Sequence, residues 1–292
     1  MAARARASPH VGIMLRSQTS GRFLKPVRLT LRAAGYWDLV ESDIEARLKR
    51  AVEIRPPLEV YQPMHHLVFS APKNLASALC VAACEAVGGQ RGDAVTAAAA
   101  LHLMHVAAIT HENLLVLPEK HAHSSYDSNI QLLTADALIP LGFEMLAGQE
   151  SGLGCGCDDV AGRVVRVIVE ITRAIGSQGV VHRQYNEYVS RHERAEEGKF
   201  CACGAACGAI LGGGDDEEVE KLRRCGRYMG MMNETSSYGD LIASGNEKAE
   251  LRNLALKELS GFDEMKIERI SCLLDSYASG QISMDLESVC SG

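Results

Sequence analysis

The sequence is poor in the residues that build β-sheets and in those that break helices. Aromatic residues make up 5% of the chain, with one Trp, and there are 8 Pro among 292 residues. Alanine, leucine, glutamate, arginine and lysine are plentiful, and these residues favour helices, whereas signals for strands are weak. The composition therefore predicts an all-α fold, and a hydrophobic fraction of 47% is enough for a sizeable core.

Acidic residues are absent from the start of the chain, before Asp38. Residues 1–35 carry seven basic side chains, and subtracting them from the net charge of −7 leaves −14 for residues 36–292. An Arg-rich, Ser-containing and acid-free start is typical of an organelle transit peptide, and a disordered basic arm for nucleic acid is the alternative. Because the acidic body would repel nucleic acid, we expect a transit peptide over residues 1–35 and no nucleic-acid partner.

Long hydrophobic runs are lacking as well. The most apolar stretch, Ala94 to Thr110, is interrupted by His102 and His105. It is shorter than the roughly 20 residues that a membrane-spanning helix needs. We therefore expect a buried core helix here and no transmembrane segment. Peripheral membrane association, through a partner or an amphipathic surface, stays open.

Helical periodicity predicts one domain over residues 36–275, followed by a tail over 276–292. An apolar stripe from Trp37 to Val52 predicts a first helix, which Pro56-Pro57 stops. Further helices are expected at about 75–87, 93–111, 132–147, 162–174 and 202–211, with another that starts near 215. Gly88 is expected to end the helix over 75–87, and Asp93 to cap the start of the next.

Four of the ten cysteines form two C-x-x-x-C motifs, one at Cys80 and Cys84 and one at Cys203 and Cys207. Residues i and i+4 lie one above the other on a helix, so each motif forms a narrow stripe of small side chains that another helix can approach closely. The Ala-rich surroundings and the lack of a secretory signal argue against a disulfide framework.

Two other readings of the cysteines stay open. Zinc could bind the two pairs, although zinc sites usually occupy a tight loop rather than a helix. Cys155 and Cys157 lie in a Gly-rich segment that we expect to be an exposed loop, and they are the pair that we expect to be redox-labile.

Several segments resemble the trans-prenyl diphosphate synthases. Leu79 to Gly89 is similar to the helix after their first substrate loop, Ala135 to Glu144 to the helix after their first metal motif, and Lys199 to Leu222 to a later helix pair. With the two C-x-x-x-C motifs, the chain resembles the plant small subunits of heterodimeric geranyl(geranyl) diphosphate synthases over about Tyr36 to Asp275. The resemblance implies an isoprenoid synthase helical bundle, a plastid location and a catalytic geranylgeranyl diphosphate synthase as the partner.

The motifs with which those enzymes hold substrate are degraded in this chain. Their first Asp-rich motif, D-D-x-x-x-x-D, falls on Glu112 and Asn113 and ends at Pro118. Their second Asp-rich motif has no counterpart in Asn233 to Asp240, although magnesium needs several carboxylate oxygens. Their diphosphate loop, G-G-K-R-x-R-P, appears as residues 71–77, where Lys73 alone keeps its charge. The resemblance therefore implies no catalytic residue and no metal in this chain, with Mg²⁺ in the catalytic partner.

Three functions remain open. The first is a catalytically inactive regulatory subunit that binds an active geranylgeranyl diphosphate synthase through Cys80, Cys84, Cys203 and Cys207 and enhances its activity or alters its product length. The second is a weak or unusual prenyltransferase, which the three degraded motifs argue against. The third is a thiol-based metal or redox module on a helical scaffold, which the Ala-rich context argues against.

Histidines also suggest a metal site. His102, His105 and His111 lie on one expected helix, followed by Glu112. Helical residues often satisfy their side chains through hydrogen bonds to neighbouring elements. We therefore expect hydrogen-bonded histidines on the helix faces rather than metal ligands.

Overall fold

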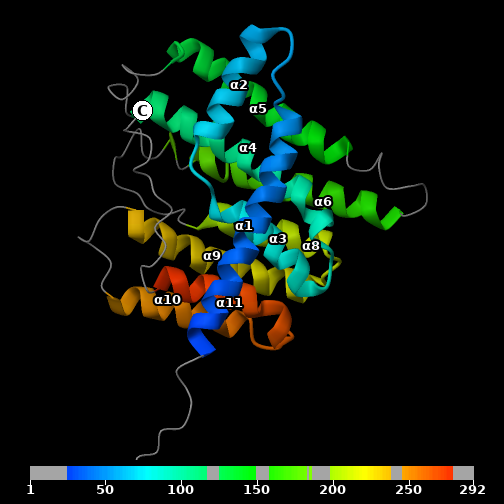
Figure 1. Cartoon of the computed structure of the whole chain (residues 1–292), viewed down its shortest axis with the longest axis vertical. Helices are drawn as coiled ribbons and strands as arrows, with labels where there is room; N and C mark the ends of the chain where they lie inside the picture. The colour runs from blue at the N-terminus through cyan, green and yellow to red at the C-terminus, as the bar shows by residue number, and fades with distance from the viewer. Residues whose placement is uncertain are drawn as a thin grey trace, which may run out of the picture.

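The computed structural model describes residues 25–116, 125–148, 158–182, 184–185, 198–237 and 245–278, and the regular structure in these ranges is helical, without strands (Figure 1). The all-α prediction is therefore confirmed. The main helices are α1 (Lys25–Ala51), α2 (Leu58–Ser70), α3 (Leu75–Val87), α4 (Arg91–Val116), α5 (Ser128–Gly148), α6 (Asp158–Ile175), α8 (Lys199–Leu211), α9 (Asp216–Ser237), α10 (Gly245–Glu258) and α11 (Glu264–Ala278).

The central helix of the bundle is α4. Between Ala97 and Ala107 almost every residue of α4 is buried, and the helix contacts α1, α3, α5 and α8. Alanines at positions 97–100 leave room for these neighbours to approach closely. The apolar run is thus the buried core helix that its composition predicts.

The length argument against a membrane span was wrong. Because α4 continues on both sides of the run from Ala94 to Thr110, it reaches 26 residues. By length and composition alone, α4 and α5 could each cross a membrane. The pair α2 and α3, which is bent by 76°, would add a third span if the two helices were counted as one. In this structure the apolar residues of α4 pack against helices of the same chain.

Helix ends follow local signals in the sequence. The bounds of α3 are those predicted, and Gly88 ends it with a φ of 103°, in the left-handed region that favours glycine. The prediction for Asp93 was off by one turn: α4 already begins at Arg91, and the Asp93 carboxylate accepts a hydrogen bond from the backbone N–H of Gln90 at 2.9 Å. Asp93 therefore stabilises the first turn from inside the helix.

The first helix also starts earlier than predicted. It begins at Lys25, so the domain boundary predicted at residue 35 falls inside α1, and residues 1–24 lie outside the described ranges. Tyr36 is buried, and its hydroxyl donates a hydrogen bond to the carboxylate of Glu85 on α3. Arg91 and Arg269 pair with the same carboxylate. This cluster ties α1 to α3, α4 and α11.

Candidate functional site

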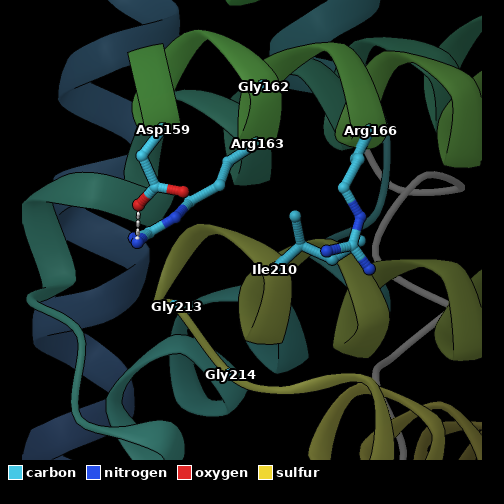
Figure 2. Close-up of a pocket in the computed structure, with 7 residues that line it drawn as sticks. All are labelled: Asp159, Gly162, Arg163, Arg166, Ile210, Gly213 and Gly214. Atoms are coloured by element: carbon cyan, nitrogen blue, oxygen red, sulfur yellow. Dashed lines mark hydrogen bonds and ion pairs between the residues drawn. The ribbon is translucent and has the colours of Figure 1, made fainter. Parts of the chain in front are cut away.

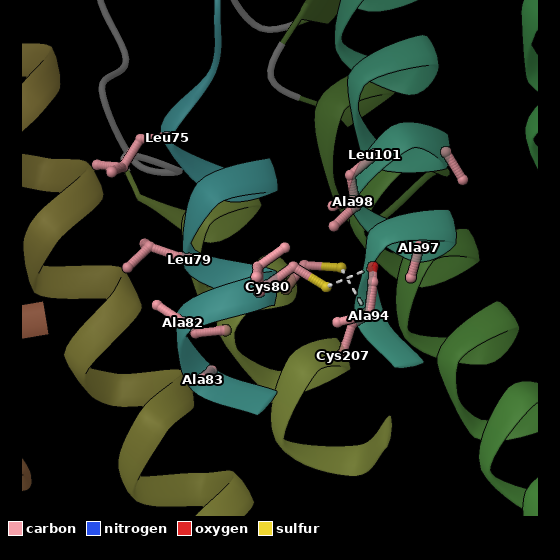
Figure 3. Packing of buried hydrophobic residues seen from close by; sticks show 14 of the residues in the cluster. Leu75, Leu79, Cys80, Ala82, Ala83, Ala94, Ala97, Ala98, Leu101 and Cys207 are labelled. Atoms are coloured by element: carbon pink, nitrogen blue, oxygen red, sulfur yellow. Dashed lines mark hydrogen bonds between the residues drawn. The ribbon is translucent and has the colours of Figure 1, made fainter. Parts of the chain in front are cut away.

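The two C-x-x-x-C motifs face each other inside the chain. They lie on α3 and α8, which pack together, and Figure 3 shows Cys80 and Cys207 between these helices and α4. Three glycines at four-residue spacing permit the contact: Gly204 and Gly208 on α8, and Gly212 directly after its end. A Cβ on any of them would overlap an α3 carbonyl oxygen, at 2.2 Å from that of Ala76, 1.9 Å from that of Cys80 and 2.6 Å from that of Cys84, respectively. The two backbones therefore touch directly.

All four motif thiols lie in the interior. Cys80, Cys84 and Cys207 are 0% exposed and Cys203 is 3% exposed. The Sγ atoms of Cys203 and Cys207 are 3.8 Å apart. In this structure the helix that approaches each motif belongs to the same chain. A role in partner binding stays a prediction, and it would have to act through the core.

Burial also decides the chemistry of these thiols. It raises the pKa of the Cys80 thiol well above its ordinary value, and burial beside the Asp93 and Glu85 charges raises the pKa of Cys84 to about 12. The contact with Cys203, with burial, raises the pKa of Cys207. The thiolate is the form that binds metals and reacts with oxidants. Protonated, enclosed thiols therefore favour a packing role over a redox or metal module.

The turn between α2 and α3 lies in residues 71–77, the segment that resembles the family's diphosphate loop, and its Asn74 side chain points inward. Asn74 is 8% exposed. Its Oδ1 accepts a hydrogen bond from the backbone N–H of Ser77 at 2.8 Å, and its Nδ2 donates to Nδ1 of His102 at 3.2 Å. His102 in turn donates from Nε2 to the carbonyl oxygen of Val68 at 3.1 Å. Burial lowers the pKa of His102, so the ring stays neutral in this chain of hydrogen bonds.

Lys73, the one basic side chain left in this turn, forms an ion pair with Glu41 of α1. The lysine side chain is 65% exposed and the glutamate 31%. The charge that would attract a diphosphate is thus offset by a carboxylate of the same chain. An exposed pair of this kind contributes little to stability, so its main consequence is electrostatic.

The segment that resembles the family's first Asp-rich motif begins near the carboxyl end of α4. Glu112 and Asn113 are partly buried there, and Nε2 of the preceding His111 lies 3.0 Å from Oδ1 of Asp136 on α5. Among the described residues, no three His, Cys, Asp or Glu side chains converge closely enough to hold a metal ion.

The three histidines of α4 do not converge. His102 bonds to Val68 and Asn74, His105 stacks on Phe200 with ring centroids 5.9 Å apart, and His111 contacts Asp136. Their environments match the expectation of helix-face histidines with neighbours of their own. Cys155, Cys157, Pro118 and residues 238–240 fall in segments that the structure does not describe, so predictions for them stay open.

An open pocket of about 300 Å³ lies between α6 and the turn from α8 to α9 (Figure 2). Arg163 pairs with Asp159 and donates to the carbonyl oxygen of Leu211, and Arg166 pairs with Asp216 at 2.9 Å. Both guanidinium charges are offset by carboxylates at the pocket, which weakens it as an anion site. The lining residues are Asp159, Gly162, Arg163, Arg166, Ile210, Gly213 and Gly214.

Sequence reasoning missed the glycines that carry the contact between α3 and α8. It took Cys203 and Cys207 as the approach face of α8, whereas Gly204, Gly208 and Gly212 meet the α3 backbone. The signal was present as three glycines at four-residue spacing. Such a row on one helix face indicates close approach of another backbone.

Comparisons with known proteins place the chain. No protein-family model matches it. It is 43% identical over 267 residues to the chloroplastic heterodimeric geranylgeranyl pyrophosphate synthase small subunit 2 of Cannabis sativa, covering 82% of this chain and 91% of that protein. It is 29% identical over 242 residues to large subunit 1 of the heterodimeric geranylgeranyl pyrophosphate synthase of Arabidopsis thaliana, covering 74% of this chain and 62% of that protein.

A solved structure agrees with these relatives. The geranyl diphosphate synthase small subunit from Antirrhinum majus superposes with a TM-score of 0.75 at 45% sequence identity, covering 84% of this chain and 99% of that chain. The predicted isoprenoid synthase fold is therefore confirmed. By sequence and by fold, the chain belongs to the family of small subunits of heterodimeric geranylgeranyl pyrophosphate synthases.

Proposed function

We propose that the chain is a non-catalytic plastid subunit that pairs with a catalytic large subunit and changes the rate or the product length of its prenyl transfer. Membership in a family of heterodimer small subunits supports the pairing, and the chloroplastic names of the relatives support the location. The large subunit is the catalyst in this proposal, and Mg²⁺ belongs to its site.

The state of the α2–α3 turn is the observation that carries the proposal. In the enzymes that the chain resembles, this loop grips a diphosphate with several basic side chains. Here the position of one arginine is taken by Asn74, which caps α3 and bonds to His102, and Lys73 is paired with Glu41. Polar groups that already have partners inside the protein gain little by turning to a ligand. A diphosphate would therefore have to break internal contacts to bind.

The carboxyl end of α4 supports the same conclusion. Removing a diphosphate leaving group requires metal ions that offset its developing charge, and magnesium takes oxygen ligands in a near-octahedral arrangement. Glu112 offers one carboxylate, Asn113 offers a neutral amide, and Asp136 contacts His111. This set does not fit a magnesium cluster, so no catalytic step is assigned to it.

A non-catalytic subunit can change its partner only by contacting some states of that partner more favourably than others. In the proposed heterodimer, this chain replaces a second catalytic copy and so changes the surroundings of the neighbouring site. A weak prenyltransferase is the alternative function, and it would need a diphosphate site other than the residues described above.

A turnover assay tests the proposal. The purified chain is incubated with isopentenyl diphosphate, an allylic diphosphate and Mg²⁺, and prenyl products are measured beside a protein-free control. We expect no product above the control, and Lys73→Ala should change nothing in this assay. Turnover near that of a normal synthase would contradict the proposal, and weak but reproducible turnover above the control would favour the alternative of a weak prenyltransferase.

A further inference from the structure

The buried stripe of α1 begins at Tyr36, well inside the helix rather than at its start. Tyr36 is 7% exposed, and the stripe continues into the core at four-residue steps. Its further members are Val40, Ile44, Leu48 and Val52. The sequence before Tyr36 is the basic, acid-free segment that we interpret as a transit peptide, although α1 already begins at Lys25. The helix therefore runs from the basic segment into the packed domain without a break.

Several other helices hold Tyr36 in place. Its hydroxyl donates a hydrogen bond to the Glu85 carboxylate of α3 at 2.5 Å. The guanidinium carbons of Arg91 and Arg269 lie 5.0 and 4.3 Å from the centre of the Tyr36 ring, and both arginines pair with Glu85. The neighbouring Trp37 packs edge to face on Tyr36, with ring centroids 4.8 Å apart. Cation–π contacts and a hydrogen bond to a charged group make Tyr36 a firm anchor for α1.

The part of α1 before this anchor unwinds more easily. Gly35 weakens a helix relative to alanine, and among the described residues nothing lies within 4 Å of the point where its Cβ would be. Lys25, Arg28 and Arg32 bring positive charge to the amino-terminal turns, where the helix dipole is itself positive. A peptidase needs an extended stretch of backbone, so it reaches the residues that open most readily. Those residues lie before Tyr36.

We propose that Tyr36 sets the amino terminus of the mature subunit, because a processing peptidase cuts α1 between Arg32 and Tyr36 and is stopped by the anchored turn. The step adds water across one peptide bond, which leaves a carboxylate on the released leader and an α-amino group on the remaining chain. Without the basic residues, Asp38 and Glu41 come to lie near the start of α1, where negative charge is favourable. The inference rests on the proposed function for the plastid location alone.

Digestion of the full-length chain tests the proposal. The purified chain is treated with subtilisin, a protease of broad specificity, and separately with an extract of plastid stroma, and mass spectrometry identifies the new amino terminus. Tyr36→Ala removes the anchor, and Tyr36→Phe is a milder variant that keeps the ring. Leu39→Ala is the matched control, because Leu39 belongs to the same helix and is 57% exposed. Circular dichroism checks that each variant keeps its helical content.

We expect the wild-type and Leu39→Ala chains to begin between residues 33 and 36 after either treatment. Proteolysis follows the population of the opened state, so Tyr36→Ala should be trimmed past Trp37, toward the next buried residue, Val40. Tyr36→Phe should be trimmed past Trp37 in a larger share of molecules than the wild type, and it decides the test if Tyr36→Ala loses its helical content.

Three results would overturn the anchor or the cleavage site while leaving the proposed function intact. They are a wild-type terminus before residue 33 or after Tyr36, stromal cleavage at a different place from the subtilisin limit, and an unchanged terminus in the Tyr36 variants. Exclusion of the full-length chain from isolated plastids would instead overturn the location in the proposed function, and the subtilisin digests would still decide whether Tyr36 is the anchor.

Discussion

Substituting Gly208 by alanine is predicted to destabilise the chain, although alanine is the better helix former. A Cβ at this position would lie 1.9 Å from the carbonyl oxygen of Cys80, and an ordinary contact needs at least 3.4 Å, so α3 and α8 must move apart by about 1.5 Å. The gain in helix propensity is about 1 kcal/mol. Overpacking a close contact costs about 1–3 kcal/mol or more, and here the clashing atom belongs to a backbone that cannot rotate away.

Taking the upper overpacking cost of about 3 kcal/mol less the propensity gain of about 1 kcal/mol, we expect Gly208→Ala to lower the free energy of unfolding by about 2 kcal/mol. Gly162→Ala is the matched control, because Gly162 also lies within a helix, α6, and nothing lies within 4 Å of its added Cβ. The control should gain up to about 1 kcal/mol. Urea denaturation followed by circular dichroism measures both. Equal stability of the two variants would refute the backbone contact between α3 and α8.

Three further predictions follow from particular contacts. Serine at both Cys80 and Cys207 should lower the free energy of unfolding by about 1–3 kcal/mol for each hydroxyl left unpaired, and should weaken binding to the large subunit only to the extent that the fold loosens. A melting curve and a binding titration test this together, and intact stability with lost binding would contradict it. The pKa of His102 is lowered in the folded chain, so its contribution to stability is complete above about pH 6.5 and should fall by up to about 1.4 kcal/mol per pH unit below that pH. Urea titrations at several pH values measure this slope. His102→Gln should reduce the slope, and a slope that persists in the variant would mean that another group is responsible. A reporter fused to residues 1–35 should enter plastids, and retention in the cytosol would contradict the transit peptide.

Local signals in the sequence were enough to predict much of the fold. The bounds of α3 could be predicted because Gly88 marks its end, and the burial of α4 because its run of alanine and leucine suits a core helix. The start of α1 at Lys25 could not be predicted, since the basic composition of that segment suggested a transit peptide or a disordered basic arm instead. Composition reports charge, whereas the tertiary contacts of Tyr36 and Glu85 help to hold this helix in place.

The candidate site was predicted in part. The scarcity of basic side chains around Lys73 and of acidic ones around Glu112 can be read from the sequence. The contacts of Lys73 with Glu41 and of His111 with Asp136 cannot, because the two members of each pair lie far apart in the sequence. The spacing of the cysteines predicted a close helix contact. It could not tell which helix makes the contact, because a stripe of small residues looks the same whether it faces its own chain or a partner.

The most direct test of the account is product analysis of the reconstituted heterodimer. The catalytic large subunit is assayed alone and with the wild-type chain, at equal concentrations of isopentenyl diphosphate, allylic substrate and Mg²⁺. The account predicts that the wild-type chain changes the rate or the product length of the large subunit's reaction. Products and rates that stay the same when the wild-type chain is bound would contradict a regulatory subunit.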